Sequence, residues 1–205
     1  IVAGEDFGNM RVFSMENKKE RKNAPLLYNL AELQNDCSKY FKISPDQTLS
    51  IVQELYEKKL VTYPRTDARV LSTAVAKEIY KNISGLQNYG ILAENAKEVL
   101  ALGSYKKIAS TKYVNDKQIT DHYAIIPTGQ GFQALNGVNS TARVVYEIIA
   151  RRFLGIFYPA AVYEKVSLVT ERRGERFYCS FKVLKEEGFR KVMQYSFAKK
   201  KVEDT

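Results

Sequence analysis

The sequence predicts an α+β protein in which a helical domain, with a helix-turn-helix or winged-helix-like core, is inserted into an antiparallel β-rich domain. Between residues 30 and 154 the apolar side chains recur mainly at helical spacing. After residue 158 the period changes to two, which is typical of strands, and a stretch near the start alternates in a similar way. We therefore expect residues 1–24 and 158–205 to form the β-rich domain and residues 25–157 to form the helical domain.

The first expected element is a strand at residues 11–18, where apolar and polar side chains alternate imperfectly. The charged run that follows breaks the pattern, and a domain boundary is expected near Pro25. A short helix is then predicted over residues 30–40, because Asn29 can act as its N-cap and Glu32 follows three residues later.

The helix that begins at Pro45 carries the clearest signals in the chain. Ser44 can serve as its N-cap, Pro45 occupies the first helical position, and Gln47 completes a capping box. Lys58 and Lys59 at its end suit the negative end of the helix dipole. Two short helices with a tight connection and a basic end predict a helix-turn-helix element.

The middle of the chain gives weaker signals. Ser72 or Thr73 can cap a helix that extends to about Asn82, and another helix is expected over residues 91–102. Residues 112–119 read as a small hairpin or bend.

The last helix and the strands after it are better defined. A helix is expected over residues 140–154, with Arg143, Arg151 and Arg152 pointing away from its apolar face. Two strands follow, at residues 162–170 and 177–183, and the turn Arg172-Arg173-Gly174-Glu175 joins them into a hairpin.

The charge of the chain indicates a class of partner. Among 205 residues, Lys and Arg number 32 against 23 Asp and Glu, which gives a net charge of +9. Positive charge distributed along the whole length favours nucleic acid as the partner. A solvated basic surface gives the same count, so the motifs have to decide.

The composition also indicates the cellular compartment. No apolar run approaches the roughly 20 residues that cross a bilayer, and no signal peptide is recognisable, so we expect a cytoplasmic, nucleoid-associated protein with no membrane partner. Cys37 and Cys179 form no CxxC pair, which excludes a thiol-rich metal site and fits a reducing compartment. The sequence begins at Ile1 rather than Met, and we expect it to be a fragment of a longer protein.

The segment of residues 60–67 contains a candidate nucleophile. A tyrosine hydroxyl is a poor nucleophile at its ordinary pKa near 10 and needs a neighbour that stabilises negative charge. Arg65 lies two residues after Tyr63, and Pro64 biases Tyr63 towards extended geometry, so both side chains could reach one phosphate. By itself, a tyrosine before a proline is more often a packed turn residue.

The segment of residues 120–128 contains the only histidine of the chain, His122. A lone histidine before an apolar run is more often a packed or capping residue than a catalyst. Neither segment is sufficient alone.

Together, the two segments resemble a known family. Thr62-Tyr63-Pro64-Arg65-Thr66-Asp67 and His122-Tyr123-Ala124-Ile125-Ile126-Pro127-Thr128 are similar to the two signatures of type IA DNA topoisomerases, the second being closest to the topoisomerase III branch. Residues 25–34 resemble the entry to the tyrosine-bearing domain of that family, and residues 152–159 resemble its exit. The resemblance spans roughly residues 11–195.

The resemblance implies an activity and a role for each matched residue. Tyr63 would attack a backbone phosphate of single-stranded DNA and form a 5′-phosphotyrosyl link, and religation would reverse the step without ATP. Arg65 would orient Tyr63 and neutralise phosphate charge, and His122 would lie near the scissile phosphate. Asp67 would either orient Arg65 or cap the following helix. The remaining candidates for DNA binding or orientation are Thr62, Lys58 and Lys59.

The resemblance also implies what this chain lacks. In the family the tyrosine works against a separate acidic domain that binds magnesium, and no Asp-x-Asp pair occurs here. We therefore expect Mg²⁺ to bind outside this chain, and the partners to be single-stranded DNA and the missing acidic and amino-terminal domains. The chain would comprise the β-rich hinge (gate) domain and the catalytic-tyrosine domain, inactive alone. Tyr123 departs from the pattern, because many topoisomerase III relatives have a second histidine there.

Three alternatives stay open at this point. A non-catalytic winged-helix DNA-binding module would explain the helices and the charge but not the paired motifs. A tyrosine recombinase needs several arginines and histidines and a tyrosine late in the domain, which the single histidine and the early Tyr63 do not match. A structural scaffold would bind no single-stranded DNA.

Overall fold

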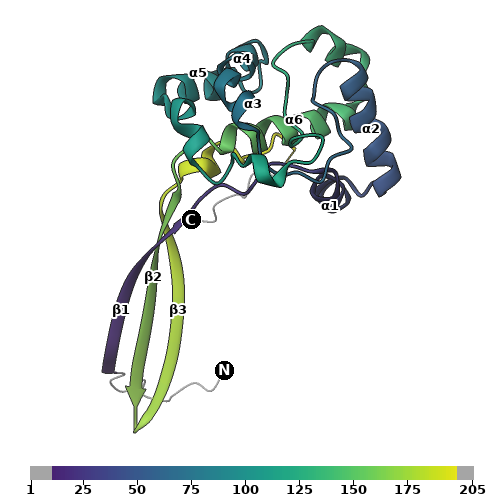
Figure 1. Ribbon diagram of the computed structural model, residues 1–205. Coiled ribbons are helices and arrows are strands. Elements are labelled where there is room, and N and C mark those ends of the chain that lie inside the picture. The colour runs from purple at the N-terminus through teal and green to yellow at the C-terminus, as the bar shows by residue number, and fades with distance from the viewer. Residues whose placement is uncertain (1–10, 198–205) are drawn as a thin grey trace. The chain divides into compact units, whose positions relative to one another are not determined.

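The fold was analysed in a computed structural model that describes residues 11–197 (Figure 1). The chain divides into two compact units. The strands form one unit, which comprises the residues up to Asn23 and Ala160–Gly188. The helices form the other unit, which comprises Ala24–Pro159 and the residues after Gly188. A mixed α+β architecture is thus confirmed.

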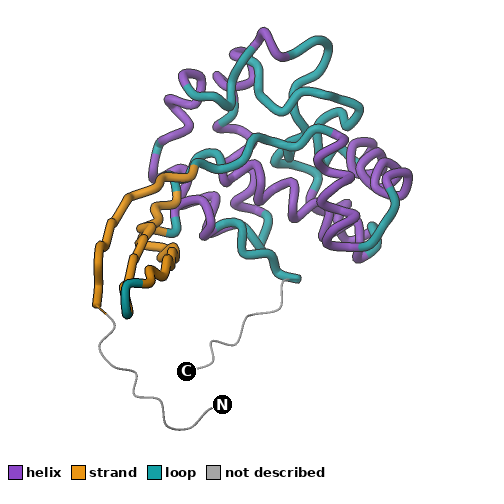
Figure 2. Tube along the Cα trace, turned by 90° about the horizontal axis from the view of Figure 1, so that it is seen from below, coloured by secondary structure: helices purple, strands orange, loops and turns teal. Residues whose placement is uncertain are grey.

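The strand unit is one antiparallel sheet with the order β1-β2-β3. Its strands are β1 (Arg11–Lys22), β2 (Ala161–Arg172) and β3 (Glu175–Glu186), which Figure 2 shows side by side. The β1 strand runs past the predicted end, because its charged residues pair in register with β2 up to Lys22 and Ala161. Backbone pairing rather than side-chain alternation therefore decides where this strand ends.

The predicted hairpin is confirmed, and its turn has a clear stereochemical cause. Arg172 pairs with Glu175, which leaves Arg173 and Gly174 as a two-residue turn. Both have positive φ, 52° and 81°. This conformation matches the right-handed twist of the flanking strands, and glycine adopts it without a steric penalty.

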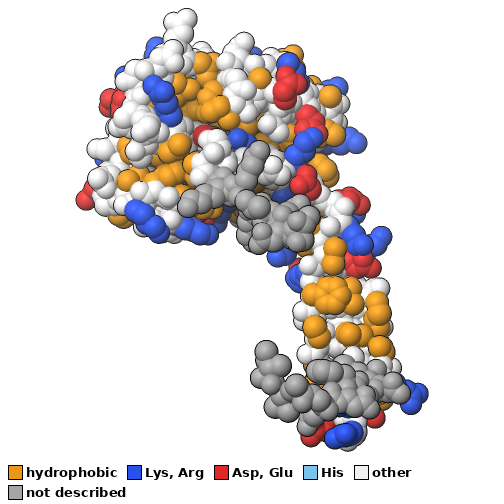
Figure 3. All heavy atoms as spheres, turned by 180° about the vertical axis from the view of Figure 1, so that it is seen from behind, with side chains coloured by type: hydrophobic (Ala, Val, Ile, Leu, Met, Phe, Trp, Pro, Cys, Tyr) orange, Lys and Arg blue, Asp and Glu red, His pale blue; other side chains and the backbone are white. Residues whose placement is uncertain are grey.

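The sheet exposes many apolar side chains (Figure 3). The exposed members are Val12, Phe13, Met15, Phe177, Tyr178, Phe181 and Val183. Only a few residues of β2, such as Val162 and Val166, are buried. The strands are therefore held together mainly by their hydrogen-bond ladders, with little apolar core of their own.

The helical unit is built around α6 (Ser140–Gly155), which is buried along most of its length. In Figure 1, α1 (Leu30–Phe41) and α2 (Pro45–Glu57) lie on one side of α6, and α3 (Thr73–Glu78), α4 (Tyr80–Gly85) and α5 (Ala93–Leu102) lie on the other. Short 3₁₀ helices connect them at Leu86–Asn88, Ser104–Ser110, Asp116–Gln118 and Phe132–Gly137.

The first two helices begin where the sequence predicted. The Asn29 side chain accepts a hydrogen bond from the Glu32 N–H, and both hydrogen bonds of the capping box between Ser44 and Gln47 are present. The α1 helix ends at Lys42, whose φ of 58° is left-handed. A connection of three residues between α1 and α2 agrees with the tight turn expected of a helix-turn-helix element.

The middle of the unit differs from expectation in one place, and in another it decides between the two expected forms, a hairpin or a bend. The helix capped by Ser72 is interrupted at Ile79, which separates α3 from α4. Residues 112–119 form no hairpin: they contain the 3₁₀ helix Asp116–Gln118, and Val114 makes one isolated parallel bridge with Leu71. The Asp116 carboxylate accepts hydrogen bonds from the Thr73 hydroxyl and N–H, so this bend serves the start of α3.

The expectation that α6 has a basic outer face is wrong at two of its three arginines. Arg151 and Arg152 are only 7% and 8% exposed. Arg151 donates to the Glu147 carboxylate at 2.7 Å and to the Val192 carbonyl at 3.0 Å. Arg152 pairs with Asp36 at 3.3 Å and lies over the Tyr28 ring. Burial is tolerated because each charge has partners of its own.

The segment after β3 belongs to the helical unit, contrary to the expected boundary. The Phe189 N–H donates to the Pro159 carbonyl at 2.9 Å, and the Ser196 N–H donates to the buried Glu147 carboxylate at 2.9 Å. Both polar and apolar contacts hold the segment, because the buried Glu147 carboxylate takes a partner from it and Val192 is buried in the apolar core. Residues 1–10 and 198–205, which were expected to belong to the β-rich domain, lie outside the described residues.

The loop of residues 124–131 threads between the two sets of helices and is braced by close backbone contacts. Ile125 and Pro127 form isolated antiparallel bridges with Tyr28 and Val61. The Asn82 side chain of α4 donates to the Pro127 carbonyl at 2.9 Å.

Within residues 11–197, no helix combines the length and apolar character needed to cross a bilayer.

We predict that Gly85→Ala destabilises the helical unit. A Cβ atom at Gly85 would lie 1.9 Å from the carbonyl oxygen of Gly129, so the backbone of α4 or of the loop has to shift. The expected loss in the free energy of unfolding is roughly 1–3 kcal/mol, measured by urea denaturation followed by circular dichroism. Gly90→Ala is the control, because its Cβ meets nothing within 4 Å. Equal stability of the two variants would contradict the close contact.

Candidate active site

The two sequence motifs meet in the structure through the side chain of Thr62. Its N–H donates to the Ile126 carbonyl at 3.0 Å, and its hydroxyl donates to the Ala124 carbonyl at 3.1 Å. The same hydroxyl accepts from the Ile126 N–H at 2.9 Å. One threonine therefore joins segments about sixty residues apart in the sequence.

A second threonine repeats this arrangement on the other side of Tyr63. The hydroxyl of Thr66, which is 7% exposed, donates to the His122 carbonyl at 2.9 Å. It also accepts from the Ala68 N–H, while the Thr66 carbonyl accepts from the Leu30 N–H at the start of α1. The backbone that carries Tyr63 is thus anchored on both sides to the backbone that carries His122.

Tyr63 is half-buried between two aromatic side chains. The centroid of its ring lies 4.3 Å from that of His122, at an interplanar angle of 40°. The ring of Tyr56, from the last turn of α2, meets it edge-on at 5.3 Å. The phenol and the only imidazole of the chain are therefore in direct contact, and helix α2 supports them from one side.

Arg65 is exposed at the centre of a tight turn. The Thr66 N–H donates to the Pro64 carbonyl at 3.0 Å, which closes a three-residue turn around Arg65. The sequence predicted that the segment is extended through Arg65. This prediction is wrong, because the hydrogen bond reverses the chain there. Among the described residues, the Arg65 guanidinium has no hydrogen bond or ion pair and is free to bind an anion.

Asp67 and the two lysines at the end of α2 are placed differently. The Asp67 side chain does not cap the next helix, since Ser72 does so. Within the described part of the chain it makes no ion pair with Arg65, and its backbone carbonyl accepts from the Asn29 side chain. Lys58 pairs with Glu54 at 3.8 Å, and Lys59 has a positive φ of 61°.

A groove of about 460 Å³ opens beside Tyr63. Its lining comprises Tyr56, Glu57, Lys59, Val61, Thr62, Tyr63, Tyr123, Thr128 and Gln130. Burial raises the pKa of Tyr123, a second phenol in the lining. Thr128 fixes one wall, because its hydroxyl donates to the Lys59 carbonyl at 2.6 Å and its N–H to the Leu60 carbonyl at 3.0 Å. The lining residues combine aromatic rings with hydroxyl, amide and ammonium side chains and one carboxylate, that of Glu57.

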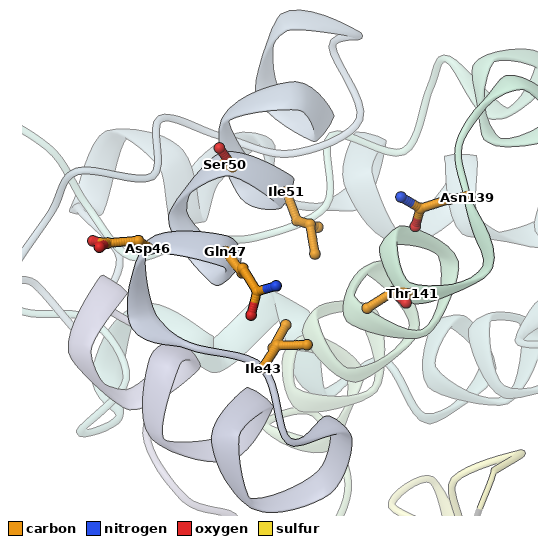
Figure 4. A pocket seen from close by; sticks show the side chains of 7 residues that line it. All are labelled: Ile43, Asp46, Gln47, Ser50, Ile51, Asn139 and Thr141. Atoms are coloured by element: carbon orange, nitrogen blue, oxygen red, sulfur yellow. The ribbon is translucent and has the colours of Figure 1, made fainter.

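A second cavity of about 460 Å³ lies away from Tyr63, between α2 and the start of α6 (Figure 4). Ile43 and Ile51 point into it, whereas Asp46 points away. The Gln47 side chain is already used in the capping box of α2. This cavity is lined by no residue of the two motifs and by no cationic side chain, so the groove beside Tyr63 is the candidate site.

No metal site is formed by the described residues: within residues 11–197, no three His, Cys, Asp or Glu side chains are grouped so that they could hold an ion. The described residues therefore do not fit the magnesium ion that the resemblance implies.

The structure brings some of the predicted residues together and leaves others apart. Thr62, Tyr63 and Lys59 line the groove and His122 lies on the Tyr63 ring, whereas Arg65, Asp67 and Lys58 are not among the lining residues. Sequence reasoning missed Tyr56, Thr66, Tyr123, Thr128 and Gln130 as parts of the site. By its helical spacing from Val52, Tyr56 belongs to the apolar stripe of α2, yet it is 38% exposed. Its position one residue beyond Leu55, at the edge of that stripe, was the available signal.

Comparison with known proteins agrees with this arrangement. The sequence profile of the DNA topoisomerase family matches residues 3–205. DNA topoisomerase 3 of Bacillus subtilis (strain 168) is 38% identical over 188 residues, which cover 90% of this chain and 25% of that protein. DNA topoisomerase 3 of Bacillus thuringiensis (strain Al Hakam) is 34% identical over 208 residues, which cover 100% of this chain and 27% of that protein.

A solved structure shows the same fold. Full-length topoisomerase I from Thermotoga maritima matches with a TM-score of 0.63 and 22% identity, over 90% of this chain and 29% of that chain. The chain spans about a quarter of the length of the curated relatives it matches. Since the family profile covers nearly the whole sequence, the resemblance drawn from the two motifs is confirmed: this chain belongs to the type IA DNA topoisomerases.

Proposed function

We propose that this chain is the central part of a type IA DNA topoisomerase and carries its nucleophile, Tyr63. The observation that carries the proposal is the contact between the Tyr63 and His122 rings, 4.3 Å apart, at the edge of a groove. Family membership supports it, because members named DNA topoisomerase 3 match over the whole of this chain.

In the proposed reaction, the hydroxyl oxygen of Tyr63 attacks a backbone phosphorus of single-stranded DNA. A bond forms between this oxygen and phosphorus, and the bond from phosphorus to the 3′ oxygen breaks. The phenol gives up its proton, and the departing 3′ oxygen takes one up to become a hydroxyl. Because the phosphotyrosyl ester keeps the energy of the broken ester, attack by the 3′ hydroxyl reseals the strand without ATP.

Arg65 is suited to bind the scissile phosphate. It is exposed and free of partners among the described residues, so anion binding would break no existing interaction. A guanidinium can donate two parallel hydrogen bonds to phosphate oxygens and can stabilise the charge that develops on them. His122, in contact with the phenol ring, is placed to orient Tyr63 or to bind an adjacent phosphate.

Thr62 and Lys59 support these residues in different ways. The Thr62 hydroxyl is occupied by the backbone of Ala124 and Ile126, which favours an orienting role over a direct DNA contact. The ammonium of Lys59 lies on the groove lining and can pair with a neighbouring phosphate. The groove would thus accept a nucleotide next to the scissile phosphate.

The remaining functions belong to parts of the longer polypeptide. We infer that an acidic domain with Mg²⁺ and an amino-terminal domain complete the site, since this chain is about a quarter of its relatives and its described residues offer no metal site. In this proposal the strand unit is the hinge (gate), and the chain alone neither cleaves nor relaxes DNA.

The alternative is a non-catalytic DNA-binding module with a winged-helix-like core. The helix pair α1 and α2 and the net charge of +9 are compatible with it. It gives no reason for the contact between the phenol and the imidazole or for the free arginine beside them. The two functions differ in one observable, the covalent adduct.

The role of Tyr63 as nucleophile is tested in a chimera, in which this chain replaces the matching quarter of the Bacillus subtilis relative. Incubation with labelled single-stranded DNA should give a denaturant-resistant protein–DNA adduct, and Tyr63→Phe should abolish it, because phenylalanine lacks the attacking oxygen. The adduct is measured by denaturing electrophoresis. An adduct that persists in Tyr63→Phe, or a folded chimera that binds DNA and forms none, would refute the role of Tyr63.

A second prediction concerns Arg65. In the same chimera Arg65→Lys should lower the rate of adduct formation by about 10²-fold, because lysine keeps the charge but loses the bidentate donors. Binding of single-stranded DNA, measured by fluorescence anisotropy, should change far less than the rate. Lys58→Gln is the control for loss of a nearby charge outside the groove. An unchanged rate in Arg65→Lys would sink the proposed role.

A third prediction concerns Tyr56, which meets the Tyr63 ring edge-on. Such ring pairs contribute about 0.5–1.5 kcal/mol, so Tyr56→Leu should slow adduct formation by about 2–12-fold. Tyr56→Phe keeps the ring and should react like the parent chimera. If the two variants react equally, the ring of Tyr56 does not position the nucleophile.

A further inference from the structure

A pair of tyrosines lies at the surface where α3 and α4 meet the 3₁₀ helix Ser104–Ser110. The rings of Tyr80 and Tyr105 are 5.7 Å apart at an interplanar angle of 45°. Tyr80 is 51% exposed, so about half of this large side chain faces solvent. Exposed aromatic pairs are costly to leave in water, and they are enriched where a protein contacts a ligand.

One lysine contacts this pair, and two more lie close to it in the sequence. The Lys106 ammonium lies 6.0 Å from the centre of the Tyr105 ring, and Lys77 and Lys81 are the exposed neighbours of Tyr80 along α3 and α4. The carboxylate nearest in sequence, Glu78, is already paired with Lys81 at 3.1 Å. We define the tyrosine–lysine patch as Lys77, Tyr80, Lys81, Tyr105 and Lys106. Its charge is positive, and residues 104–112 add two more lysines and no carboxylate.

The patch is separate from the groove beside Tyr63. Asn82 and Gly85 occupy the side of α4 that contacts the loop at Pro127 and Gly129. Tyr80 precedes Asn82 by two residues, which turns its side chain by about 200° around the helix. The aromatic pair therefore points away from the loop that forms one wall of the groove.

We propose that the tyrosine–lysine patch is a second binding surface for single-stranded DNA, outside the groove of Tyr63. The combination of aromatic rings with lysines fits this ligand, because unpaired bases stack on the rings while the ammonium groups contact phosphates. Duplex DNA fits less well, since its bases are already stacked and its backbone meets only the lysines. The surface would hold a stretch of the strand away from the bond that is cut, and it needs no cleavage to do so.

The test is binding of a fluorescent oligothymidylate by this chain, measured by fluorescence anisotropy over a range of salt concentrations. All variants carry Tyr63→Phe, so that the outcome does not depend on strand cleavage. Tyr80→Ser removes the exposed ring, and Tyr80→Phe keeps it. Lys77→Gln with Lys106→Gln removes two charges from the patch, and Lys18→Gln with Lys19→Gln removes two exposed charges from β1 as the matched control.

We expect Tyr80→Ser to weaken binding at least about fivefold, and Tyr80→Phe to bind like the parent. The double variant Lys77→Gln, Lys106→Gln should have a slope of log affinity against log salt that is smaller by about 0.7 for each lysine removed. The control pair should leave the affinity and the slope unchanged. An oligonucleotide with 5-iodouracil should photocross-link to the peptides that contain Tyr80 or Tyr105.

Three results would overturn the proposal. The first is equal weakening by the control pair, which would show that binding follows total charge. The second is equally strong competition by polyglutamate or by duplex DNA, which would assign the patch to acidic polypeptides or to double-stranded backbone. The third is cross-linking confined to peptides of the Tyr63 groove. None of them bears on whether Tyr63 is the nucleophile, which the covalent adduct tests by itself.

Discussion

The site depends on the hydrogen bonds by which Thr62 and Thr66 hold the segment of His122 against the segment of Tyr63. Each threonine uses a side-chain hydroxyl to bind backbone groups that a continuous strand pair would satisfy through its own ladder. The two motifs can therefore lie side by side without forming a sheet, and the chain between the two threonines is free to turn at Arg65. A regular strand pair would hold Arg65 in an extended conformation, whereas this arrangement exposes it in a turn two residues after Tyr63. The surrounding helices serve the same geometry, since α2 supplies Tyr56 and α4 braces the loop at Pro127.

Much of the local structure could be predicted because its causes are local. The caps at Asn29 and Ser44 and the turn at Arg173 and Gly174 depend on side chains within three residues of each other. The core site residues were predicted from two short motifs, and the contact between Tyr63 and His122 follows from how those motifs pair. The errors arose where distant partners decide. Arg151 and Arg152 read as surface residues in the helix pattern, but the Val192 carbonyl and the Asp36 carboxylate, both far along the chain, are among the partners that allow them to be buried.

The extent of β1 and the boundary after β3 show the same limit. The charged residues of β1 lie in a strand because β2 provides a backbone ladder for them, and nothing in their own sequence signals it. The segment after β3 joins the helical unit through two kinds of contact. Val192 is buried in the apolar core of that unit, and the Glu147 carboxylate accepts hydrogen bonds from Arg151 and from the Ser196 N–H. Periodicity reports which face of an element is apolar. It does not report which buried group needs a partner, and here the residues after Gly188 belong to the helical unit instead of the strand unit.

The chain has fourteen tyrosines, and their surroundings explain why one of them is the candidate nucleophile. Burial raises the pKa of Tyr28, Tyr89, Tyr146, Tyr158 and Tyr195, and raises that of Tyr113 to about 12. A phenol whose charged form is disfavoured in this way is a poor nucleophile, and a buried one cannot reach a phosphate. Tyr63 differs because it reaches a groove, touches the only imidazole of the chain and has a free guanidinium two residues away. Geometry thus singles out Tyr63, and activation of its hydroxyl depends on the phosphate and on groups outside this chain.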